Sequence, residues 1–110
     1  MINNANPNTA LLAQLLNRLA AEEQRAHEKM ANPSYWRNVG QIELTAAHDI
    51  RQCLQQVPDT LSPAGYLAAV TTALEALVAA WRANSLDEDG YGVATVHSVI
   101  AVVPVQNGKA

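Results

Sequence analysis

The 110-residue chain contains no phenylalanine, a single cysteine, two tryptophans and three tyrosines. With Cys53 alone, no intramolecular disulfide can form and no cysteine-based zinc site has enough ligands. This cysteine usage favours a reducing cytoplasm. The aromatic anchors of the core must therefore come from Trp36, Trp81 and the tyrosines.

Charge is sparse and scattered along the chain. Seven basic and ten acidic residues give a net charge of −3. The basic residues form no patch, which argues against a nucleic-acid partner, and the acidic excess is too dispersed to mimic nucleic acid. The N-terminus lacks the basic region and cleavage site of a secretory peptide. No uninterrupted apolar run reaches the roughly 20 residues that span a bilayer. The sequence therefore predicts a cytoplasmic protein that does not contact membranes.

Motifs that mark common active sites are also missing. The chain has no phosphate-binding glycine loop and no nucleophile elbow. Residues 84–92 form an acidic segment with Asp87, Glu88 and Asp89, but the spacing lacks the alternating ligands of a calcium loop. This segment predicts a solvated turn.

The clearest helix signal spans residues 62–83. Ser62 is a strong N-cap, Pro63 suits the first helical position, and helix formers follow without a breaker. The side opposite the apolar stripe carries alanines and Thr72, and Glu75 is the only charge between Pro63 and Trp81. Either this helix contacts protein on two sides, or the alanines are simply exposed helix formers.

Two further helices precede it, over residues 9–31 and 36–57. Apolar residues recur in both with the alternating spacing of four and three that marks a helix–helix seam. Pro33 and Pro58 separate the three helices, and the short links predict antiparallel neighbours. We expect one domain over residues 1–110, with residues 1–8 as an arm and an antiparallel three-helix bundle. Its predicted core is Leu16, Leu19, Ile50, Leu54, Leu74 and Trp81.

Residues 93–105 are uncharged and rich in β-branched side chains, which predicts a strand. No other segment of the sequence indicates a strand. An unpaired strand exposes its backbone N–H and C=O groups, so this one is expected to pair with the same segment of another copy or with a partner's sheet edge. Alternatively, the strand covers the helices and its backbone N–H and C=O groups are hydrated. Val96, His97 and Val99 are the candidate partner contacts on it.

Residues 32–38, between the first two helices, carry Tyr35, Trp36 and Arg37. An aromatic pair beside an arginine can grip a partner or a ligand base. It can also form a hydrophobic lid over the end of the bundle, which is the interpretation we favour. These three residues join the candidate partner contacts.

Glu23 and Glu43 interrupt otherwise apolar seams on the facing sides of the first two helices, about one helical turn apart, with His27 one turn after Glu23. Facing carboxylates near a histidine can bind a divalent metal or share a proton. Otherwise they are structural, and replacing either with glutamine relieves repulsion. Glu23 and His27 are four residues apart rather than three, which favours the structural interpretation. The structural partners would be water or Arg37, Arg51 or Arg82.

These features predict a mainly α fold with a C-terminal strand. The function they favour is a non-enzymatic protein–protein interaction module, a regulator or inhibitor of the kind that phages and mobile elements encode. It would bind a protein partner as a homo-oligomer and need no cofactor. The alternative is a helical bundle that binds a divalent metal or small ligand through Glu23, Glu43 and His27.

Overall fold

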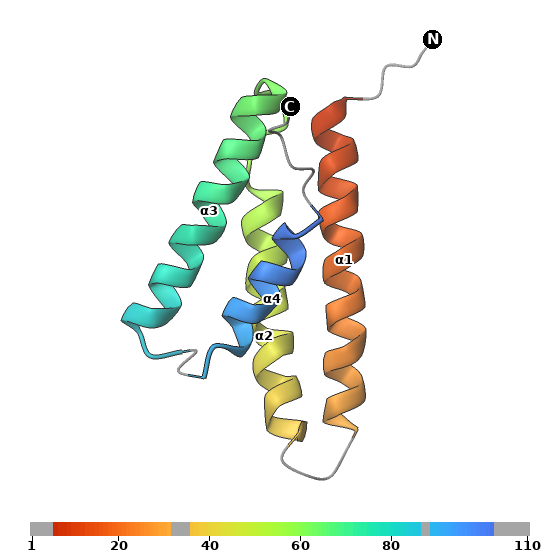
Figure 1. Cartoon of the computed structure of the whole chain (residues 1–110), viewed down its shortest axis with the longest axis vertical. Coiled ribbons are helices and arrows are strands. Elements are labelled where there is room, and N and C mark those ends of the chain that lie inside the picture. Colours follow the sequence, from red (N-terminus) through yellow and green to blue (C-terminus); the bar gives the residue numbers. More distant parts are fainter. Residues whose placement is uncertain (1–5, 32–35, 87–88, 103–110) are drawn as a thin grey trace.

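The computed structural model describes residues 6–31, 36–86 and 89–102, which form four α-helices (Figure 1). They are α1 (Pro7–Met30), α2 (Trp36–Gln55), α3 (Pro63–Ala83) and α4 (Tyr91–Ile100). Successive helices run in opposite directions (Figure 1). The first three lie within two residues of the predicted ranges at each end, which confirms the mainly helical fold.

The helix starts follow from local capping. The Asn6 side chain accepts the backbone N–H of Asn8 and caps α1, with Pro7 next in the chain. The Ser62 hydroxyl accepts the N–H of Gly65 at 3.0 Å and caps α3, with Pro63 as the first residue. Each cap satisfies one N–H that has no partner within its helix, and proline loses nothing at this position.

The predicted C-terminal strand is wrong over residues 93–100, because residues Tyr91–Ile100 form α4; residues 103–105 lie outside the described residues. Gly90, with φ of 79°, turns the chain into this helix. Val93, Val96 and Val99 are spaced three apart and all point into the protein. A helix satisfies its own backbone groups, whereas a strand needs a partner. That advantage outweighs the few tenths of a kcal/mol by which β-branching disfavours a helix.

α4 changes the architecture from three helices to four. It packs against all three other helices and lies in front of α2, between α3 and α1 (Figure 1). α1 and α3 consequently touch each other least of all the pairs. The core forms where the four helices meet, and its fully buried large side chains are Leu15, Leu19, Val39, Ile50, Leu54, Tyr66, Val70, Leu74 and Val99.

The core prediction holds with one exchange. Leu19, Ile50, Leu54, Leu74 and Trp81 are buried as expected. Leu16 is only partly buried, and its neighbour Leu15 is fully buried instead. Because adjacent residues on a helix differ by about 100°, the most deeply buried side of α1 is turned away from the one centred on Leu16.

α3 bears on the expectation that the protein does not contact membranes. By length and composition it is the one described helix that could cross a bilayer. Apolar helices in the cores of soluble proteins pass the same test, but only 22% of the most apolar stretch of α3 is buried in the single chain. Most of this apolar stretch is therefore not covered by the rest of the chain.

Candidate functional site

The two candidate carboxylates lie between α1 and α2, and each meets a cation. Glu23 on α1 accepts from Arg51 on α2, one of the structural partners anticipated from the sequence. Glu43 on α2 accepts from Lys29 on α1 at 2.8 Å. Lys29 lies six residues beyond Glu23, roughly 9 Å along the helix axis. The glutamates therefore occupy different levels and form two separate cross-helix ion pairs.

The remaining metal candidate, His27, lies exposed on α1. His48 is also exposed and contacts the Gln52 amide nitrogen at 3.2 Å. In the described part of the chain no three His, Cys, Asp or Glu side chains are grouped as metal ligands. The structure does not bring Glu23, Glu43 and His27 together as one site.

The predicted partner contacts separate into different environments. Tyr35 lies outside the described residues, Trp36 begins α2, and Arg37 is exposed on the first turn of that helix. On α4, Val99 is fully buried and Val96 nearly so, while His97 is exposed. The helical turn of α4 thus directs both valines inward, where a strand would have placed Val96 and Val99 on opposite faces.

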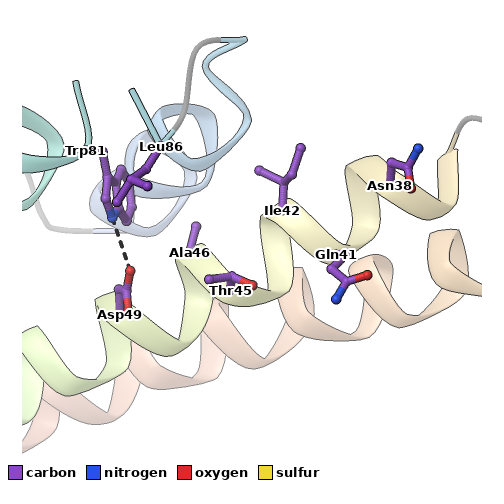
Figure 2. Close-up of a pocket in the computed structure, with 8 residues that line it drawn as sticks. All are labelled: Asn38, Gln41, Ile42, Thr45, Ala46, Asp49, Trp81 and Leu86. Atoms are coloured by element: carbon purple, nitrogen blue, oxygen red, sulfur yellow. Dashed lines mark hydrogen bonds between the residues drawn. The ribbon is translucent and has the colours of Figure 1, made fainter. Parts of the chain in front are cut away.

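One apolar opening, between α2 and α3, is a groove that we call the Trp81 groove (Figure 2). It has a volume of about 360 Å³. α2 supplies one side, α3 supplies the tryptophan, and the segment after α3 supplies a leucine. The lining residues are Asn38, Gln41, Ile42, Thr45, Ala46, Asp49, Trp81 and Leu86.

One polar contact organises the Trp81 groove. The Trp81 indole N–H donates to an Asp49 carboxylate oxygen at 3.1 Å (Figure 2). This bond satisfies an indole that is only 4% exposed and fixes the ring at one end of the groove. Ile42 and Leu86, two of the three exposed large hydrophobic residues in the described chain, are 36% and 65% exposed. The groove thus combines exposed aliphatic walls with one carboxylate.

Sequence reasoning missed the Trp81 groove, although a signal exists. Asn38, Ile42, Thr45 and Asp49 follow the helical spacing of four, three and four residues along α2. The stripe mixes polar and apolar residues, so it resembles a solvated face. It borders the groove because α3 approaches α2 at Trp81 and continues to the exposed Leu86.

A second opening, which we call the α3/α4 groove, has a volume of about 480 Å³. It shares no described lining residue with the Trp81 groove. Apolar side chains from both helices form most of it, and charged or titratable groups lie among them. The lining residues are Thr71, Leu74, Glu75, Val78, Ala79, Arg82, Val93, Val96, His97 and Ile100.

A polar cluster attaches α4 to α1 and so shapes the α3/α4 groove. Arg18 Nε donates to the Ser98 hydroxyl at 2.9 Å, and that hydroxyl donates to Glu22 at 2.8 Å. Glu22 also pairs with Arg18 and Arg25, as the helical spacing predicts. These bonds set the rotation of α4, which directs Val96 and His97 toward α3.

A scan of the chain against protein-family models found no match, and searches of curated proteins and of solved structures found none either.

Proposed function

We propose that this protein is a non-enzymatic interaction module, a regulator or inhibitor that binds a protein partner in the cytoplasm while self-associated. The observation that carries the proposal is the Trp81 groove. Ile42 and Leu86 present aliphatic surface to solvent around a firmly held tryptophan. Aromatic and aliphatic anchors in a concave site, with a polar rim, are the usual centre of a protein interface.

The chemistry of the Trp81 groove suggests what binds there. Its helical α2 wall and its elongated stripe suit an amphipathic helix that inserts apolar side chains one turn apart. Asp49 uses one carboxylate oxygen for Trp81. Its other oxygen can accept from a lysine or arginine of that helix, which would give the interaction its orientation.

Partner capture from the native cell, quantified by mass spectrometry, tests this function. We expect one protein to copurify with the intact chain and to be lost with Ile42→Asp and with Leu86→Asp. Gln14→Asp, an exposed substitution of the same charge change on α1, is the matched control and should retain it. Circular dichroism establishes that all variants stay folded. If the groove variants retain the same proteins as the control, the proposal is wrong.

No observation favours the alternative of a metal or ligand site at Glu23, Glu43 and His27. Both carboxylates have basic partners from the facing helix. A structural role therefore explains the two glutamates without a metal.

A further inference from the structure

α3 carries two charges along its 21 residues, Glu75 and Arg82. Both are exposed and both line the α3/α4 groove. Within the described residues neither forms an ion pair. Seven residues separate them, which corresponds to two turns and roughly 10 Å along the axis. They therefore lie on one side of the helix, one at each end of the same stripe.

The midpoint between these charges falls between Val78 and Ala79. A two-fold axis through this point makes two copies of α3 antiparallel and places Glu75 of each copy level with Arg82 of the other. A parallel pair would instead place Glu75 beside Glu75 and Arg82 beside Arg82. Opposite charges stabilise the antiparallel register and like charges oppose the parallel one.

We propose that the α3/α4 groove is a homodimer interface, in which α3 of a second copy lies antiparallel with two reciprocal Glu75–Arg82 ion pairs. This inference rests on the proposed function, since it specifies how the module self-associates. A two-fold interface must complement itself, and a single pair of opposite charges placed symmetrically about Val78 and Ala79 does so.

Apolar surface supplies the driving force of this dimer, and the charges set its register. Exposed ion pairs contribute little to affinity. Between Glu75 and Arg82 the groove is lined by Val78 and Ala79, and α4 adds Ile100. Ala79 is small enough for two helix backbones to approach closely. The neighbouring exposed residues Thr72, Ala76 and Ala83 lack charge and bulk.

A lipid bilayer is the alternative environment for the exposed side of α3. Glu75 lies near the middle of this helix and is exposed, so it would enter the hydrocarbon core at a large energetic cost. Tyr66, Val70, Leu74 and Trp81 meanwhile hold the opposite side of α3 in the protein core. A second copy covers the free side while giving Glu75 a partner, and for this reason we favour the dimer.

Charge exchange tests the interface by sedimentation equilibrium at low ionic strength. The intact chain should be a dimer. Glu75→Arg and Arg82→Glu alone should each raise the dimer dissociation constant at least about tenfold, because like charges then meet twice. The double variant E75R/R82E restores opposite charges and should return the constant to within about threefold of the intact value. Glu28→Arg, at an exposed site on α1, is the matched charge control for Glu75→Arg and should have little effect.

A cysteine placed near the axis gives independent support. In a Cys53→Ala background, Ala79→Cys should form an intermolecular disulfide on mild oxidation, since the two copies of residue 79 lie closest to the axis. Ala20→Cys, exposed on α1, should not. Failure of residue 79 to crosslink in a dimeric protein would argue for a different interface.

The outcomes separate the two proposals. The antiparallel α3 interface is wrong if neither single variant raises the dimer dissociation constant, or if E75R/R82E does not restore it. The proposed interaction function would still stand in that case. A monomeric intact chain overturns both the interface and the self-association in the proposed function. A monomer that floats with neutral phosphatidylcholine vesicles overturns them in favour of membrane binding by α3.

Discussion

Tyr66 is the described residue whose side chain carries a buried polar atom without a hydrogen-bond partner. It is fully buried in the core, on the first turn of α3. Burial, with a smaller contribution from the charge of Asp59, raises the pKa of its phenol above the ordinary 10.0. A buried hydroxyl without a partner costs about 1–3 kcal/mol, so Tyr66 lowers stability relative to an apolar ring of the same shape.

We expect Tyr66→Phe to raise the free energy of unfolding by about 1 kcal/mol or more, since it removes only the unpaired hydroxyl. The advantage should grow above pH 10. The pKa of Tyr66 is raised in the folded chain, so the unfolded chain loses this proton first and stability falls as pH rises through that range. Urea titrations of both proteins at neutral pH and above pH 10 measure the difference. A less stable variant at neutral pH would show that the hydroxyl has a partner.

The ion pairs of Glu23 and Glu43 reverse the direction of the stability change that the sequence predicts for substitution of these residues by glutamine. Repulsion between two glutamates predicts that glutamine stabilises, but each carboxylate faces a base instead. All four side chains are partly exposed, which limits each pair to roughly 0.2–1 kcal/mol. Glu23→Gln and Glu43→Gln should therefore each lower stability by less than about 1 kcal/mol.

Thermal melts of Glu23→Gln, Glu43→Gln and the double variant check this, with and without Mg²⁺, Mn²⁺ or Zn²⁺. A bound metal would raise the melting temperature of the intact protein alone. We expect no such rise. A metal-dependent increase that disappears in the double variant would restore the metal site as the better interpretation.

Gly40 shows how one element depends on its neighbour. It lies in α2, where glycine is less favourable than alanine by about 1 kcal/mol. A Cβ at this position would lie 2.5 Å from the Ala26 carbonyl oxygen and 2.9 Å from the Lys29 Cβ. Glycine is therefore required at this close approach of α2 to the backbone of α1, and the two helices would have to separate to admit any side chain.

Helix propensity and packing predict opposite results for Gly40→Ala. Propensity alone would stabilise the protein, whereas overpacking costs typically 1–3 kcal/mol. Because the nearest atom belongs to the backbone, we expect a net loss of about 1–2 kcal/mol. Denaturant unfolding measures it. A gain in stability would mean that α1 and α2 are farther apart than the structure places them.

The four helices differ in how well the sequence predicts them. Ser62 with Pro63 located α3, and the seam through Leu19 and Ile50 located α1 and α2, because caps and periodicity are local signals. The β-branched composition of residues 93–105 favours a strand, whereas the spacing of Val93, Val96 and Val99 is compatible with the helix that forms. Whether residues 93–100 form a strand or a helix depends on the residues that pack against them. Those residues are distant in the sequence.

The candidate site was less predictable than the helices. The pairing of Glu23 with Arg51 was among the expected options, since both lie near the α1–α2 seam. The Trp81 groove was not, because it depends on where α3 ends relative to α2. Trp81 was correctly placed in the core, but its bond to Asp49 joins residues 32 positions apart. Such long-range placement is set by packing rather than by local pattern.

At the scale of the whole molecule, α4 completes a bundle that three helices leave open. It lies between α1 and α3, which touch each other least, and contributes Val93, Val96 and Val99 to the interior. Ser98 binds Arg18 and Glu22 on α1 at the same place. We therefore expect the four helices to unfold as a single cooperative unit rather than as three helices with an accessory segment.

Deletion of residues 91–110 tests this cooperativity. If this segment were an accessory strand, the helical signal would survive its removal. The structure predicts the opposite, because burial of each valine contributes about 1.5–3 kcal/mol and a small domain is stable by only about 5–15 kcal/mol. We expect the truncated chain to lose a sharp thermal transition by circular dichroism and to bind a hydrophobic dye through its opened core. A chain ending at Val102 keeps α4 and is the control, with a cooperative melt expected. A cooperative melt in the shorter chain as well would mean that α1, α2 and α3 close against each other without α4.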